Sequence, residues 1–125
     1  LPEKIERKDG AIIVVSSVGG LRGSPVLGAY CISKAADLQL VRNLAVEHGK
    51  HNVRVNAISP GLVRTDFAKA LWENPDILKD RTAGDPLRRI GEPREIAGAA
   101  VYLASAAGFF TTGQNFVVDG GATIS

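Results

Sequence analysis

The sequence contains no methionine and only one cysteine, Cys31, among its 125 residues. A single cysteine excludes an internal disulfide and any metal site built from several thiolates, and it suits a reducing compartment such as the cytoplasm. The two histidines, His48 and His51, have no carboxylate or cysteine at metal-binding spacing, so we expect no metal site. Nothing at Leu1 resembles a secretory signal peptide. Because no initiator methionine is present, we expect the chain to be a fragment, or the ordered part, of a longer protein.

Charge of one sign and long apolar runs are scarce as well. Fifteen lysines and arginines against 13 aspartates and glutamates leave a formal net charge of +2. The basic residues are scattered, which excludes the clustered positive surface of a nucleic-acid-binding protein. No apolar stretch approaches the ~18 residues of a membrane-spanning helix. The remaining composition, 45% hydrophobic and 22% charged, is that of a soluble globular protein of one domain or part of one.

What the sequence does contain is an alternation of apolar strands and helices. The hydrophobic patterns predict strands at 11–17, 52–59 and 115–118, and helices at 25–48 and 93–108. The order strand, helix, strand, helix, strand gives a parallel sheet with helical crossovers. The sequence therefore predicts an α/β fold.

Local signals indicate how these elements begin and how they are covered. Ala11–Val15 is an unbroken run rich in β-branched residues, typical of a strand buried on both faces. Ser24 is a good N-cap and Pro25 suits the first helical position, so we expect the first long helix to begin there. That helix is apolar nearly all round, which indicates the sheet on one side and a partner helix, for example from another subunit, on the other.

One stretch carries residues that suggest chemistry. Ser17 ends the first strand, and Tyr30 and Lys34 lie four residues apart on the following helix, where they share a face. Pro60-Gly61 ends the second strand. Because ligands of open parallel sheets bind beyond the carboxyl ends of the strands, these residues should meet in one crevice.

A serine, a tyrosine and a lysine together suggest proton transfer to or from a substrate oxygen. An isolated phenol is too weak an acid for this at neutral pH, and a nearby ammonium favours the phenolate. The tyrosine can then act as acid or base, while Ser17 hydrogen-bonds the same oxygen as charge develops. Such chemistry fits the interconversion of an alcohol and a carbonyl, with the hydride supplied by a cofactor.

With this spacing, Ser17 and Tyr30-Cys31-Ile32-Ser33-Lys34 resemble the active-site signature of the short-chain dehydrogenase/reductase family. Further stretches match the family in order along nearly the whole chain: Asn56-Ala57-Ile58-Ser59-Pro60-Gly61, Val63-Arg64-Thr65, Pro86-Leu87-Arg88-Arg89-Ile90-Gly91-Glu92-Pro93, and Thr112-Gly113-Gln114 with Val118-Asp119-Gly120-Gly121. The resemblance implies a Rossmann-type doubly wound fold. Residues 1–125 would be a single domain fragment holding its last three strands.

The resemblance implies a role for each residue of the signature. Tyr30 would be the acid/base, Lys34 would bind the nicotinamide ribose hydroxyls and assist Tyr30, and Ser17 would orient the substrate carbonyl. Tyr30 and Lys34 would thus contact the cofactor, NAD or NADP. The family's glycine-rich phosphate-binding turn and its NAD-or-NADP selector are absent and would lie upstream of Leu1, so we expect the chain alone to bind cofactor poorly.

The resemblance extends to the rest of the site. The turn at Pro60 and Gly61 would pack beside the nicotinamide, and the Val63 backbone and Thr65 would meet its carboxamide. Residues 66–91 would cover a small-molecule substrate. The family's last helix and strand commonly form subunit contacts and many members are tetramers, so we expect a homo-oligomer, either a dimer or a tetramer.

The 66–91 loop is the least regular part of the sequence. Asp66 is expected to cap a short helix that runs through Trp72. Trp72 itself is either a substrate contact or a packing residue, and the sequence does not distinguish the two. Apolar residues in the loop suggest a small or hydrophobic alcohol and carbonyl pair.

Two other functions are compatible with parts of the sequence. A catalytically inactive interaction or dimerisation module would explain the missing phosphate-binding turn and the helix that is apolar on two sides. A serine hydrolase is disfavoured because no Gly-x-Ser-x-Gly nucleophile elbow is present.

Overall fold

Three parallel strands form the centre of the structure, a computed structural model that describes all 125 residues. The sheet has the order β1-β2-β3. In chain order the elements are α1 (Pro2–Arg7), β1 (Gly10–Val15), η1 (Val18–Gly20), α2 (Gly28–His48), η2 (Gly49–His51), β2 (Val53–Pro60), α3 (Lys69–Trp72), α4 (Pro75–Thr82), α5 (Pro93–Ala104), η3 (Ala106–Gly108), β3 (Asn115–Val118) and η4 (Ala122–Ile124). The predicted order of strands and crossover helices is confirmed.

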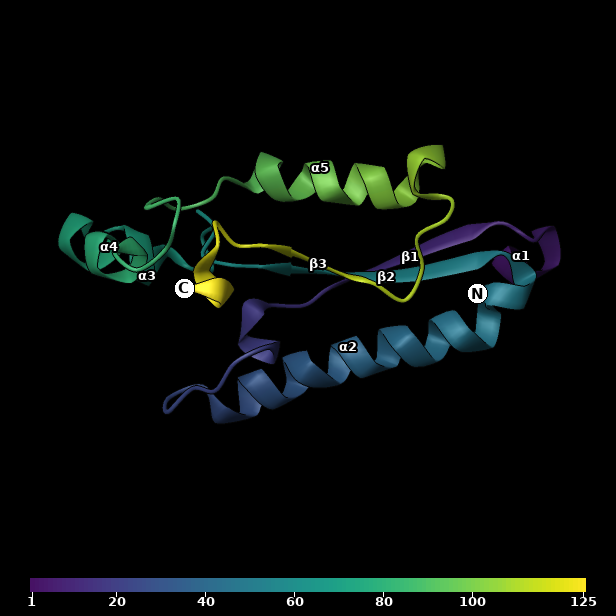
Figure 1. Cartoon of the computed structure of the whole chain (residues 1–125), viewed down its shortest axis with the longest axis horizontal. Helices are drawn as coiled ribbons and strands as arrows, with labels where there is room; N and C mark the ends of the chain where they lie inside the picture. Colours follow the sequence, from purple (N-terminus) through teal and green to yellow (C-terminus); the bar gives the residue numbers. More distant parts are fainter.

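Helices cover both faces of the sheet, with α2 on one face and α5 on the other (Figure 1). Side chains alternate along β2, so its odd-numbered residues face α2 and its even-numbered ones face α5. On the α5 side, Leu103 and Ile58 are fully buried. The main core cluster lies on the α2 side and consists of Leu38, Val41, Ala45, Val53, Val55 and Ala57. This is the doubly wound α/β arrangement that the sequence predicts.

β1 lies at the edge of the sheet that these 125 residues form, and within this chain most of its residues are only partly buried. Val15 at its carboxyl end is 58% exposed, whereas Val53 and Val55 of β2 are fully buried. β2 pairs with a strand on each side, and no strand of this chain pairs with the outer edge of β1. An apolar run shows that a strand can be buried, but its neighbours decide whether it is.

α2 begins at Gly28, three residues later than predicted. The hydroxyl of Ser24 does accept hydrogen bonds from the amides of Val26 and Leu27, at 3.2 and 2.9 Å. These bonds close a separate turn, after which Leu27 is the residue that precedes the helix. Ser24 therefore caps a turn rather than α2.

Three further differences concern the second half of the chain. α5 ends at Ala104, before the predicted Gly108, because the chain tightens into η3. Asp66 does not cap α3, whose N-cap is Ala68. α4 was not predicted, although Asn74 caps it by accepting from the amide of Asp76 at 2.9 Å.

The outer face of α2 is apolar and uncovered within this chain. Ile32, Leu40 and Val46 are 73%, 50% and 85% exposed. The sheet covers the other side of the helix, as predicted. Neither α2 nor any other helix combines the length and hydropathy needed to cross a membrane.

Candidate active site

The turn after β1 holds the end of the strand against α2. The Ser16 hydroxyl donates to the carbonyl of Lys34 at 2.8 Å and joins the strand end to the helix. η1 can lie close to α2 because Gly20 has no side chain, since a Cβ there would be 2.7 Å from the carbonyl carbon of Lys34. The glycine in this turn is therefore required by a close approach of two backbones.

The same turn brings Ser17, Tyr30 and Lys34 together. A Cβ on Gly19 would meet Tyr30 Cε1 at 3.2 Å and Ser17 Oγ at 3.4 Å, so both side chains border the same small space. Lys34 Nζ lies 5.6 Å from the centroid of the Tyr30 ring, within the range in which an aromatic face attracts an ammonium. The hydroxyl of Ser17, just after β1, thus lies near the phenol of Tyr30 and the ammonium of Lys34 on α2.

The polar ends of these side chains have hydrogen-bonding capacity to spare. Ser17 Oγ accepts from the amide of Gly19 at 3.0 Å, which leaves its own proton to donate. The Tyr30 hydroxyl makes no hydrogen bond within the chain. The hydroxyl of Ser33 does donate to Tyr30, but to its backbone carbonyl. The Lys34 ammonium is paired with the carboxylate of Asp37 at 3.8 Å. Sequence reasoning missed Asp37, which its spacing of three residues from Lys34 could have revealed.

The turn after Pro60 also requires a glycine. The amide of Gly61 donates to the carbonyl of Val118 at 3.0 Å, and a Cβ on Gly61 would lie 2.8 Å from the Cα of Asp119. Burial raises the pKa of the Asp119 carboxyl, but hydrogen bonds, from Thr123 above all, outweigh it and leave that pKa below its ordinary value. An ionised Asp119 therefore holds the chain end in place through Gly121 and Thr123.

The extended segment after this turn leaves the peptide groups of Val63 unpaired. The Gly91 amide donates to the carbonyl of Leu62 at 3.0 Å, and the Arg64 amide donates to the carbonyl of Gly91 at 2.9 Å. Peptide groups alternate in direction along an extended segment, so those of Val63 point away from Gly91. Neither its N–H nor its carbonyl has a partner within the chain.

Thr65 adds a hydroxyl to these groups. Its Oγ1 accepts from the amide of Ala68 at 3.3 Å, which leaves its proton to donate, and its carbonyl accepts from the indole N–H of Trp72 at 2.8 Å. A carboxamide offers one acceptor and two donor hydrogens. The carbonyl and N–H of Val63 and the hydroxyl of Thr65 therefore fit the carboxamide of a nicotinamide.

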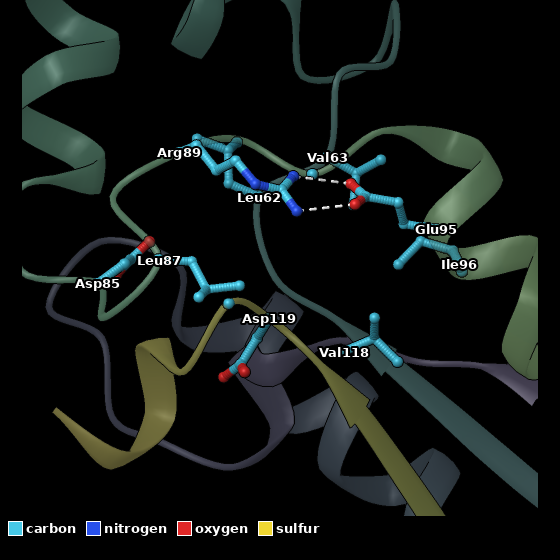
Figure 2. Close-up of a pocket in the computed structure, with 11 residues that line it drawn as sticks. Leu62, Val63, Asp85, Leu87, Arg89, Glu95, Ile96, Val118 and Asp119 are labelled. Carbon is cyan, nitrogen blue, oxygen red and sulfur yellow. Dashed lines mark hydrogen bonds and ion pairs between the residues drawn. The ribbon is translucent and has the colours of Figure 1, made fainter.

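A hollow of about 130 Å³ lies next to this segment (Figure 2). Of the residues predicted from sequence to form the site, only Val63 lines it, and Ser17, Tyr30 and Lys34 do not. Its other lining residues include Leu62, Leu87, Ile96, Val118 and Asp119. The hollow is thus distinct from the cluster formed by Ser17, Tyr30 and Lys34.

An ion pair at the border of this hollow fastens the end of the 66–91 loop to α5. Arg89 donates two hydrogen bonds to the carboxylate of Glu95, at 2.8 and 2.9 Å, and Figure 2 shows the two side chains facing each other. The hydrogen bond from Arg89, then that from the Glu92 amide, lower the pKa of Glu95 to about 2. The same pair raises the pKa of Arg89.

We expect the contribution of Glu95 to folding stability to disappear in acid. Because its folded pKa of about 2 lies below the ordinary 4.5, the contribution is complete above pH 4.5 and is lost as the pH falls towards 2. The stability difference between the full-length protein and its Glu95→Gln variant, measured by urea denaturation, should shrink across that window. A difference that does not change with pH would contradict this assignment.

Comparison with known protein families gives an independent result. The family described as Enoyl-(Acyl carrier protein) reductase matches residues 2–123. Dehydrogenase/reductase SDR family member 4 of Bos taurus is 43% identical over 122 residues, which cover 98% of this chain and 44% of the relative. Oxidoreductase UcpA of Salmonella typhimurium is 44% identical over 131 residues, covering 99% and 50% respectively. The chain spans about half the length of the curated relatives it matches.

Solved structures of similar proteins superpose closely on this chain. A short-chain type dehydrogenase/reductase from Mycobacterium ulcerans matches with a TM-score of 0.94 and 36% identity, covering 98% of this chain and 45% of the other. A gluconate 5-dehydrogenase from Burkholderia cenocepacia, in complex with NADP and tartrate, matches with a TM-score of 0.94 and 31% identity over 99% and 49%. A 4-hydroxyisoleucine dehydrogenase mutant complexed with NADH and succinate gives 0.94 and 38% over 99% and 51%.

Proposed function

Because this chain belongs to the short-chain dehydrogenase/reductase family, we propose that the protein containing it interconverts an alcohol and a carbonyl by NAD(P)-dependent hydride transfer. A general oxidoreductase role follows from the family, and the reaction is the proposal. The observation that carries it is the convergence of Ser17 and Tyr30 on Gly19, with Lys34 Nζ 5.6 Å from the tyrosine ring.

Each of the three side chains has one task in the reduction of a carbonyl. The Tyr30 hydroxyl donates its proton to the carbonyl oxygen, and the Ser17 hydroxyl donates a hydrogen bond to the same oxygen. The Lys34 ammonium stabilises the phenolate that remains and donates to the nicotinamide ribose hydroxyls. A bound nicotinamide supplies the hydride. In the oxidation direction the phenolate takes the proton of the alcohol.

The cofactor in this proposal is NAD or NADP. One similar solved structure is a complex with NADP and another with NADH, and this chain lacks the residues expected to choose between them. Pro60 and Gly61 would pack beside the nicotinamide ring. The unpaired peptide groups of Val63 and the hydroxyl of Thr65 would bind its carboxamide.

The remaining features of the proposal concern the domain, the substrate and the assembly. Residues 1–125 form the catalytic half of a single domain, in which the 66–91 loop covers a small-molecule substrate. The uncovered apolar face of α2 supports a homo-oligomer, either a dimer or a tetramer. Neighbouring exposed apolar side chains on one helix face are typical of a surface that another subunit covers. We place the protein in the cytoplasm, which a single free cysteine suits.

Replacing Lys34 by methionine tests the proposal. In the full-length protein, Lys34→Met should lower turnover by about 10²-fold at saturating cofactor, since the cation that assists proton transfer is gone. Its KM for the cofactor should rise as well, because the ribose loses a donor. Turnover is measured from the absorbance of the reduced nicotinamide with a panel of alcohols and carbonyls.

Lys50 on η2 offers a matched control, since it is an exposed lysine at the opposite end of α2. Lys50→Met should keep the wild-type turnover and KM. Equal turnover in the Lys34 and Lys50 variants would refute the proposed role of Lys34.

A further inference from the structure

Trp72 makes a contact that joins α3 to the segment proposed to bind the cofactor. Its indole N–H donates to the backbone carbonyl of Thr65 at 2.8 Å. The same carbonyl also accepts from the amide of Ala68 at 3.1 Å. Of the aromatic apolar side chains, only tryptophan carries a ring N–H that can donate in this way. The packing role considered for Trp72 from sequence therefore includes a specific hydrogen bond.

The face of the indole ring is held as well as its edge. The guanidinium of Arg64 lies 5.1 Å from the ring centroid, close enough for a cation–π interaction. Arg64 in turn donates to the carboxylate of Glu92 at 3.1 Å, and the two form an ion pair. Two independent contacts thus fix the orientation of the Trp72 ring.

The same network reaches the other end of the 66–91 loop. The amide of Glu92 donates to Glu95, whose carboxylate also accepts the two bonds from Arg89. Trp72, near the beginning of the loop, is therefore connected through Arg64 and Glu92 to the point where the loop returns to α5. Arg64, a member of this network, lies between Val63 and Thr65 in the chain.

We propose that Trp72 is a positioning residue that holds Thr65, and with it the unpaired groups of Val63, in the orientation that receives the nicotinamide carboxamide. The inference rests on the proposed function, since it assigns Thr65 to the cofactor. Without the indole bond, Thr65 is held only by the Ala68 amide, which is shared between its carbonyl and its hydroxyl, so its orientation is less tightly fixed. Cofactor binding then includes the cost of ordering it again.

The test is Trp72→Phe in the full-length protein, which keeps a ring under Arg64 and removes the N–H donor. We expect the dissociation constant and KM for the nicotinamide cofactor to rise about three- to tenfold, the range that corresponds to one hydrogen bond. Turnover at saturating cofactor should stay within about twofold of wild type, because the reacting groups are untouched. Phe67→Leu is the control, since Phe67 is a 92% exposed aromatic residue of the same loop.

A double-mutant cycle distinguishes positioning from general stability. If Trp72 acts through Thr65, Trp72→Phe should cost less cofactor affinity in a Thr65→Val background than in wild type, because only the Val63 groups are then left to position. Additive effects, or an unchanged dissociation constant in Trp72→Phe, would overturn the proposal. Should Trp72→Phe fail to fold, Thr65→Val alone decides, because an unchanged dissociation constant for the cofactor in that variant also overturns the proposal.

Failure of this inference can be told apart from failure of the proposed function. If the protein is not an NAD(P)-dependent oxidoreductase, wild type itself will not bind the cofactor or transfer hydride. If only the role of Trp72 is wrong, wild type will do both and Trp72→Phe will bind the cofactor equally well.

Discussion

Tyr30→Phe in the full-length protein should abolish measurable turnover while leaving cofactor binding mostly intact. The substitution removes only the hydroxyl, so the ring remains beside Gly19 and under the Lys34 ammonium. Without the hydroxyl, no neighbouring group can give the carbonyl oxygen a full proton, because an aliphatic hydroxyl such as that of Ser17 is a much weaker acid than a phenol. A loss of at least about 10²- to 10⁴-fold is expected for a general acid.

Tyr102 on α5 provides the matched control, since it is the other tyrosine of the chain. Its hydroxyl lies 3.0 Å from Thr111 Oγ1 on a different part of the molecule. Tyr102→Phe should keep wild-type turnover. Turnover is followed by nicotinamide absorbance and cofactor binding by direct titration. If Tyr30→Phe turned over substrate at the wild-type rate, the proposed chemistry would be refuted.

Arg54→Met should lower the stability of the fold clearly. Arg54 is 7% exposed in β2, and its guanidinium donates to the carbonyls of Leu103 and Gly108 at 2.8 and 2.7 Å. Its positive charge also lies 5.5 Å from the centroid of the Phe109 ring. The substitution leaves both carbonyls without this donor. The Gly108 carbonyl still accepts from the amide of Thr111 at 2.9 Å, so only the Leu103 carbonyl is left unpaired. The expected loss is therefore about 1 to 3 kcal/mol, the cost of one buried unpaired carbonyl.

Urea denaturation of the full-length protein measures this effect. Arg42→Met is the control, since Arg42 lies on the exposed surface of α2 and donates only to Gln39. It should change stability by no more than about 0.5 kcal/mol, as is usual for surface substitutions. Arg54→Lys should fall between the two, because an ammonium cannot reach both carbonyls with the geometry of a guanidinium. Equal stability of Arg54→Met and wild type would show that α5 and η3 are held by other contacts.

The sequence predicts the order of strands and helices because each element carries its own hydrophobic pattern. Apolar periodicity was sufficient for the order of strands and helices, because it reflects which side of each element faces the core. The meeting of Ser17 with Tyr30 and Lys34 also followed from the sequence. Ser17 follows the end of a parallel strand, and the other two residues lie one helical turn apart near the beginning of the crossover helix. The topology therefore leaves all three a single edge of the sheet.

Features that depend on distant partners could not be predicted in the same way. The exposure of Val15 depends on which strand lies beside β1, and its own apolar run contains no information about that neighbour. Arg54 is charged and is the second residue of a buried strand, where the carbonyls of Leu103 and Gly108, about fifty residues later, and the ring of Phe109 stabilise it. The sequence does not distinguish a substrate contact from a packing role for Trp72. Its partner is the backbone carbonyl of Thr65, which every residue type would offer equally.

The unpaired outer edge of β1 has a practical consequence. Its free N–H and carbonyl groups, from Gly10 to Val15, form a row to which an extended segment of any other chain can add. Prepared as an isolated polypeptide, these 125 residues would therefore tend to associate edge to edge and to precipitate. Low solubility of such a preparation would say nothing about the behaviour of the full-length protein.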